Sequence, residues 1–215
     1  MTRGAVSRAL ARRPGRVWWL AGLVVVGGLL FTAGLLVEVR CAVGQCPRPR
    51  VRRWLDLDVL GGLPRLFTTW VFVAVAVLAA VAAVRSVSWA RVWWAAVAAG
   101  GVVLAVAKLV SSHSALEQDG GRVATLVGGV VVAVLGLSGL WVAGRRWAVP
   151  GASAVTVALA VYAVAALGLD QVTAGVRAVG GSPVALAVAS YVEEGGEGLA
   201  AVAVLAAVSA WGPRR

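Results

Sequence analysis

The chain has 215 residues, of which 60% are hydrophobic and only 13% are charged, and its mean hydropathy is +0.90. This composition excludes an ordinary soluble domain. The formal net charge of +11 does not indicate nucleic-acid binding, because the arginines are spread over the ends of apolar stretches and their loops, where they orient a membrane protein and meet anionic headgroups. A single Lys, no Asn and abundant Val, Ala, Gly and Arg are typical of an actinobacterial coding bias.

Apolar stretches long enough to approach a membrane span, about 20 residues, recur along the chain. They lie near Val17–Val37, Thr68–Val84, Val92–Val110, Val123–Ala143, Ala152–Leu169 and Val184–Trp211. Because the runs are continuous and do not alternate, they favour helices over a membrane β-barrel. The sequence therefore predicts an all-α polytopic membrane protein, a six-transmembrane-helix bundle whose partner is the lipid bilayer, with a protein partner or a homo-oligomer left open.

The arginines predict the domain boundaries and the orientation. Residues 1–16 hold five Arg residues and are expected to be a cytoplasmic basic N-terminus, followed by one membrane domain over 17–211 and a cytoplasmic tail over 212–215. The first run is about 20 residues long and lacks an A-x-A site, so we expect it to be retained rather than cleaved. Both termini are then cytoplasmic in the cell membrane, and every acidic residue falls on the outer side. Four arginines disagree with this orientation: Arg48, Arg50, Arg52 and Arg53.

The predicted extracytoplasmic loop, residues 38–67, contains the only two cysteines. Cys41 and Cys46 are close in sequence and would face an oxidising compartment, so the simplest interpretation is a disulfide-closed loop. A catalytic dithiol would need a second redox pair, which the chain lacks, and free thiols remain an alternative. The segment Arg53–Pro64 is too short and charged to span, and Trp54 suits an interface, so we expect an interfacial or re-entrant segment.

The last apolar stretch carries three carboxylates, Glu193, Glu194 and Glu197. Carboxylates inside a membrane span are costly and usually mark function, and these three fall within about 100° of a helical wheel. His113 and Glu117 share a face at the end of the third stretch, and Asp170 ends the fifth. These six residues are the candidate cation- or proton-binding site.

Three interpretations of this acidic site remain open. The acids could form a structural network of ion pairs with Lys108, Arg122, Arg177 or the arginines of 48–53. They could carry protons, since three carboxylates in a low-dielectric medium would not all ionise. Finally, His113, Glu193 and Glu197 could bind a divalent cation, which is the one cofactor that the sequence suggests.

No complete catalytic constellation is present. Gly136-Leu-Ser138-Gly139 has the spelling of the rhomboid-protease nucleophile, but the last stretch holds no histidine base, and a single histidine excludes a His₃ zinc site of the ceramidase type. A membrane enzyme acting on a lipid or quinone therefore ranks behind a cation or proton site and behind a non-catalytic membrane subunit or scaffold.

Two other patterns concern packing. The glycine pairs at 100–101, 128–129 and 195–196 are typical of close helix contact, with local unwinding at 195–196 as an alternative beside the acids. The tryptophans indicate an aromatic belt at the span ends. They are Trp18, Trp19, Trp89, Trp93, Trp94, Trp141, Trp147 and Trp211.

Several motifs resemble a group of uncharacterised bacterial multi-pass membrane proteins. They are Asp56-Leu-Asp58 with Pro64 and Thr69-Trp70, Gly168-Leu-Asp170, and Glu193-Glu194-Gly-Gly-Glu197, which matches that group's Glu-Glu-x-x-Glu motif in its last span. The third stretch departs from the group, because Ser111-Ser-His113-Ser-Ala-Leu-Glu117 lacks its paired acids. The resemblance implies a multi-span fold and an acidic site, and it implies no particular activity.

Overall fold

The computed structural model describes residues 14–57, 59, 61–110 and 122–211. Among these residues the regular structure is entirely helical, which confirms the all-α class. The helices are α2 (Pro14–Ala42), α3 (Pro49–Leu55), α4 (Leu63–Arg85), α5 (Ser88–Val110), α7 (Arg122–Arg146), α8 (Ala152–Ala178) and α9 (Pro183–Trp211).

Five of these helices are long and apolar enough to cross a membrane. They cover Trp18–Ala42, Leu63–Arg85, Ser88–Val110, Leu126–Arg146 and Ala152–Ala178. The chain is therefore a helical membrane protein whose surroundings are a lipid bilayer. The sixth long helix, α9, has 29 residues but does not belong to this group, and it carries three carboxylates near its middle.

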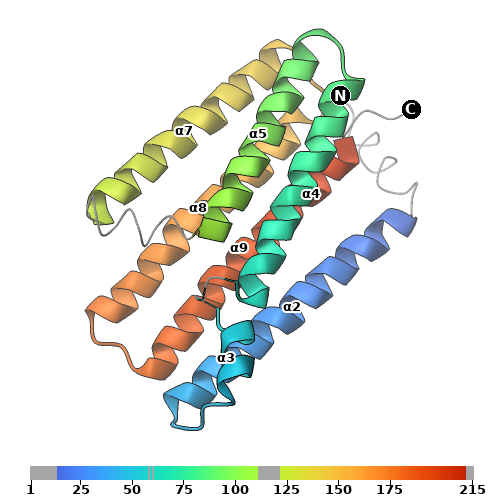
Figure 1. Cartoon of the computed structure of the whole chain (residues 1–215). Helices are drawn as coiled ribbons and strands as arrows, with labels where there is room; N and C mark the ends of the chain where they lie inside the picture. Colours follow the sequence, from blue (N-terminus) through green and yellow to red (C-terminus); the bar gives the residue numbers. More distant parts are fainter. Residues whose placement is uncertain (1–13, 58, 60, 111–121, 212–215) are drawn as a thin grey trace.

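The long helices run roughly antiparallel to their chain neighbours in one bundle (Figure 1). The helix α9 packs against α2, α4 and α8, while α4 packs on α5 and α7 on α8. As a result α9 lies at the centre and contributes a large share of the buried residues, from Ala187 to Ser209. The first turn of α2 and the last turn of α9 lie at the same end of the bundle (Figure 1).

The helices extend beyond the apolar stretches that predict them. α2 continues to Ala42 and α8 to Ala178, because neither Glu38 nor Asp170 breaks a helix at these positions. α8 ends before Gly180, whose φ of +70° lies in the left-handed region that favours glycine at a helix end. The predicted 38–67 loop is correspondingly shorter, since α4 begins at Leu63 with Pro64 in its first turn, where a missing N–H costs little.

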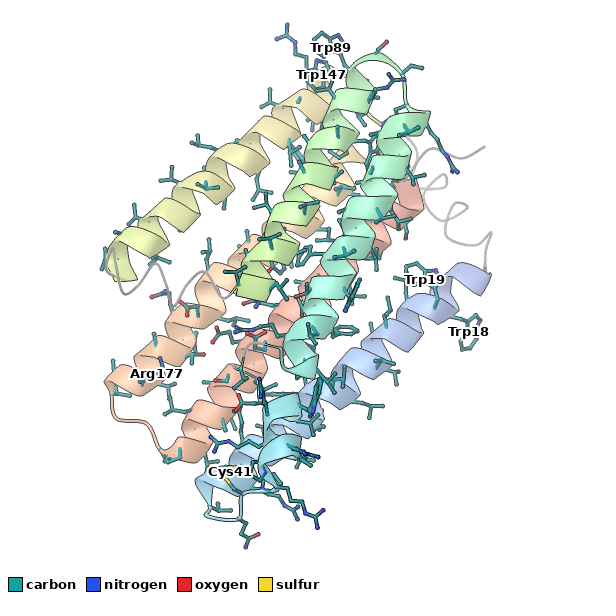
Figure 2. All side chains as sticks on the ribbon, viewed as in Figure 1. Trp18, Trp19, Cys41, Trp89, Trp147 and Arg177 are labelled. Carbon is teal, nitrogen blue, oxygen red and sulfur yellow. A yellow bond between two sulfur atoms is a disulfide. The ribbon has the colours of Figure 1, made fainter. Side chains whose placement is uncertain are left out.

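The tryptophans divide into two groups. Trp89 and Trp147 stack at one end of the bundle, with ring centroids 5.1 Å apart, and Trp18 and Trp19 lie on the first turns of α2 (Figure 2). These exposed or half-buried rings agree with a belt near a membrane surface.

Trp93 and Trp94 do not belong to such a belt, and that part of the expectation is wrong. Both are almost completely buried, at 1% and 2% exposure. The Trp93 indole N–H donates to the carbonyl of Leu140 over 2.9 Å, which joins α5 to α7 and satisfies the buried polar group.

The segment between α2 and α4 is anchored to α2. A disulfide joins Cys41 to Cys46, as the cysteine spacing predicts. The backbone N–H of Leu57 donates to Glu38 over 3.2 Å, and the Leu57 side chain is fully buried against Gly34. This region forms a short helix, α3, which begins a few residues earlier than the predicted Arg53–Pro64 segment.

The alternative of local unwinding at 195–196 is wrong, because α9 is helical from Pro183 to Trp211. The glycines there serve close packing instead. A Cβ at Gly196 would lie 2.6 Å from Leu169, and one at Gly198 would lie 2.6 Å from the Phe31 ring.

Candidate functional site: a buried cluster of four charges

Two carboxylates of α9 face the inside of the bundle. Glu194 and Glu197 are three residues apart, so they share one face of the helix, and only 2% and 4% of their surfaces are exposed. Both lie near the middle of the 29-residue helix. Within this helix they are the residues most in need of partners, because a buried ion without a partner is strongly unfavourable.

The first partner is Lys108, which lies in the last turn of α5. Its Nζ is 2.6 Å from Glu197 Oε2 and 3.3 Å from Glu194 Oε2. The ammonium therefore bridges the two carboxylates across the bundle. The lysine side chain is 14% exposed, and its long flexible stem lets a residue near a helix end reach the middle of α9.

The second partner is Arg65, in the first turn of α4 directly after Pro64. Its Nη2 donates to Glu194 Oε1 over 3.3 Å. Two acids thus face two bases, and the formal charges of the cluster cancel. A balanced set of this kind is what allows charged groups to remain in a low-dielectric interior.

A tyrosine connects the cluster to α8. The Tyr162 hydroxyl donates to Glu197 Oε2 over 3.3 Å. Its ring makes an edge contact with Phe72 of α4, with centroids 4.6 Å apart. The charge cluster, defined here as Arg65, Lys108, Tyr162, Glu194 and Glu197, therefore draws on α4, α5, α8 and α9.

One buried hydroxyl lies beside this cluster. Thr68 is one helical turn beyond Arg65 and is fully buried, and its Oγ1 has no hydrogen-bond partner among the described groups. It lies 3.6 Å from the position that a Cβ on Gly198 would take. An orphaned polar atom in a dry interior calls for an explanation, such as a water or a ligand.

The remaining predicted site residues lie outside these ion pairs. Glu193 is half-buried, and Asp170 is close enough to act on it electrostatically. Asp170 also accepts a hydrogen bond from the Gln171 side chain over 2.9 Å. His113 and Glu117 fall outside the described residues, so the structure does not place them relative to α9.

The candidate metal ligands do not form a metal centre within the described part of the chain. No group of three or more His, Cys, Asp and Glu side chains there could hold a metal ion. The two buried carboxylates are instead joined by an ammonium group. The metal candidates Glu193 and Glu197 are therefore not brought together with a third ligand among these residues.

Among the basic residues that the sequence offered as partners, Lys108 is the one that contacts these acids in the structure. Arg177 is exposed near the end of α8 (Figure 2), and the arginines of 48–53 are also exposed. The side chain of Arg122 is not among those that the structure describes. Arg65 and Tyr162 were missed by sequence reasoning, although an arginine directly after the proline that begins a span is a signal that could have been followed.

An apolar cavity of about 430 Å³ lies apart from these charges, on the side of α9 that faces α2. Its lining includes Gly27, Phe31, Phe67 and Gly195, and none of the charged residues. Among the residues that the structure describes, the buried charged groups are therefore concentrated in the charge cluster. In comparisons with known proteins, no family model, no curated protein and no solved structure matches this chain.

Proposed function

We propose that this chain is a six-span membrane protein whose charge cluster is an exchange site for a cation or a proton, with Glu197 as the central carrier. The observation that carries the proposal is the place of Lys108. Its ammonium lies between two buried carboxylates, 2.6 Å and 3.3 Å from their oxygens, where a bound cation would lie. Lys108 thus serves as a built-in occupant that an external cation or a proton can replace.

The length of α9 supports the sixth span. At about 1.5 Å per residue its 29 residues extend about 43 Å, which exceeds the hydrocarbon core of about 30 Å. Pairing within the cluster offsets the cost of charge at this depth, so the carboxylates of α9 do not prevent a span. With six spans, both ends of the chain lie on one side, and the arginine distribution favours the cytoplasm.

Thr68 adds support to the exchange proposal. Its buried hydroxyl oxygen lacks a hydrogen-bond partner among the described groups, at the same level of the bundle as Glu197. It would be a further oxygen for a water or a cation that approaches the carboxylates. Together with the Tyr162 hydroxyl it gives the site neutral oxygens beside the charged ones.

The second candidate is a non-catalytic membrane subunit or scaffold, and the charge balance favours it. Two bases already neutralise two acids, so the cluster could serve only to hold α4, α5, α8 and α9 together. A buried ion pair is often replaceable by well-packed neutral groups, whereas removing one partner alone is strongly destabilising. The two candidates therefore differ in how variants of the cluster respond to ions.

The deciding experiment follows thermal unfolding of the purified protein against pH and against added Na⁺, K⁺ and Mg²⁺. For an exchange site we expect wild type to be stabilised by one of these ions or to release protons over the pH range, since a ligand that binds only the native state adds stability. Glu197→Gln should abolish that response. Glu193→Gln is the matched control for the response to added ions, because Glu193 is on the same helix but outside the ion pairs.

Lys108→Met sharpens the comparison. For an exchange site, removal of the built-in occupant should make the variant bind an external monovalent cation and be stabilised by it. For a scaffold, Lys108→Met should be unstable at every ion concentration, by about 3–5 kcal/mol, and Lys108→Met/Glu197→Gln should recover most of that loss. No ion or pH response in wild type or in Lys108→Met would overturn the exchange proposal.

A further inference from the structure

The short helix α3 (Pro49–Leu55) separates its residues into two faces. At about 100° per residue, Val51, Trp54 and Leu55 fall within an arc of about 100°. The arginines fall on the remaining part of the circumference, with Arg50, Arg52 and Arg53 in the helix and Arg48 directly before it. This is an amphipathic helix with a cationic face, which is the pattern of helices that lie in a membrane surface.

The protein leaves both faces of α3 largely uncovered. None of its residues is buried, and Trp54 and Val51 are 55% and 44% exposed. The four arginines are exposed as well. An uncovered Trp beside guanidinium groups is suited to the boundary between hydrocarbon and headgroups.

The position of α3 agrees with such a boundary. It lies at one end of the bundle, beside the last turns of α2 and the first turn of α4 (Figure 1), where two membrane-crossing helices end. The Cys41–Cys46 disulfide and the buried Leu57 attach the segment on both sides of the helix. The cationic face is therefore held in place rather than carried on a loose loop.

The ion pairs that the structure describes near α3 leave most of this cationic face without a carboxylate contact. Among the described residues the arginines of 48–53 make one acidic contact, a wide one of 3.9 Å from Arg52 to Asp56 with an exposed arginine. A surface pair of this kind contributes little. Planar guanidinium groups match the geometry of phosphate oxygens and bind them in a bidentate manner.

We propose that α3 is a docking surface for anionic phospholipid headgroups of the leaflet against which it lies. The apolar residues Val51, Trp54 and Leu55 enter the interface, and the arginines bind the phosphates. This inference depends on the membrane class of the protein and is independent of the exchange site. It also gives a reason for four arginines at a place that the distribution of the other arginines would leave neutral.

Hydrogen exchange of the full-length protein in lipid nanodiscs tests the proposal. In phosphatidylglycerol we expect the amides of 50–55 to exchange several-fold more slowly than in phosphatidylcholine, and 1 M salt should remove the difference. Arg50→Gln/Arg53→Gln should also remove it, since each arginine near an anionic surface is worth about fivefold in affinity. Arg50→Lys/Arg53→Lys is the matched control and should keep it, because it preserves the charge.

The connection between α4 and α5 is the internal reference. It lies at the opposite end of the bundle beside Arg85 (Figure 1), so substitutions in α3 should not change its exchange. Equal exchange of 50–55 in the two lipids would overturn the proposal. A slowing of exchange in phosphatidylglycerol that persists in Arg50→Gln/Arg53→Gln would also overturn it. So would equal protection of 50–55 in phosphatidylcholine nanodiscs after a soluble polyanion is added.

Discussion

At the scale of single residues, the central feature is the set of donors that pair with the buried Glu197 carboxylate. One of its oxygens accepts from both the Lys108 ammonium and the Tyr162 hydroxyl. These donors come from different helices, α5 and α8, so each of the two contacts also joins α9 to another helix of the bundle. The neutral donor can be removed without changing the charge of the cluster.

Tyr162→Phe should therefore lower the stability while keeping the core filled, because the ring and its contact with Phe72 remain. Hydrogen bonds to charged groups contribute about 1.5–3 kcal/mol, and we expect a loss of that size in thermal or denaturant unfolding in detergent. Tyr191→Phe is the control, since Tyr191 makes no hydrogen bond to a described residue and should show little change. Equal effects of both substitutions would contradict the role given to Tyr162.

The sequence predicts part of this cluster. Helical spacing placed Glu193, Glu194 and Glu197 on one face of a span, and Lys108 was one of several basic residues that the sequence offered as partners. The structure pairs Glu194 and Glu197 with Lys108 and leaves Glu193 outside the ion pairs. The partners Arg65 and Tyr162 are 129 and 35 residues away along the chain. No local period encodes such pairings, because they depend on which helices become neighbours in the bundle.

At the scale of helices, the glycines of α5 show how packing selects one residue of a pair. A Cβ on Gly101 would lie 3.1 Å from the backbone of Ala76, whereas one on Gly100 would meet nothing within 4 Å. The two residues are indistinguishable in sequence. Of the two glycines, Gly101 is the one that allows α4 and α5 to approach each other closely.

Gly101→Leu should separate α4 from α5 and lower the free energy of unfolding by about 1–3 kcal/mol, the usual cost of overpacking. Gly100→Leu adds the same side chain one position earlier, on an exposed face, and should be close to neutral or slightly stabilising, since leucine has the higher helix propensity. Thermal unfolding of both variants in one detergent provides the measurement. If the two losses were equal, the close contact at Gly101 would not limit the packing.

The places of the long helices that the structure describes were predictable, but their ends were not. Apolar windows stop at the first charged residue, while the helices continue through Glu38 and Asp170 because the backbone hydrogen bonds do not depend on hydropathy. At Gly195 and Gly196 the helix is likewise continuous, so close packing is the correct interpretation and local unwinding is not. Two glycines weaken a helix in isolation, but here their small size brings α9 against Leu169 and Phe31.

At the scale of the whole molecule, charge is distributed unevenly between the two ends of the bundle. Arg85 and Arg91 flank the connection from α4 to α5, and Arg145 and Arg146 precede the connection from α7 to α8. Neither connection contains an acid. All nine acidic residues of the chain lie in other segments. This asymmetry is the basis for predicting which end faces the cytoplasm.

The orientation can be tested with single cysteines in a Cys41→Ala/Cys46→Ala background. Val179 lies between α8 and α9 and is 84% exposed, and Val87 lies between α4 and α5 and is 75% exposed. These connections are at opposite ends of the bundle (Figure 1). A membrane-impermeant thiol reagent added to intact cells should label Val179→Cys and not Val87→Cys, and permeabilised cells should show both. Labelling of Val87→Cys alone in intact cells would reverse the proposed orientation.

The central place of α9 has a consequence for the order in which the chain is made. In the six-span arrangement, α9 leaves the ribosome after the other long helices described here, yet it supplies both carboxylates that Lys108 contacts. Until then α5 holds its lysine ammonium in the membrane without these acids, and any intermediate is incomplete at its centre. The helix whose carboxylates are costly to place in a bilayer alone is thus the one whose charged partners are already in the membrane. We therefore expect the insertion of α9 and the completion of the core to occur together.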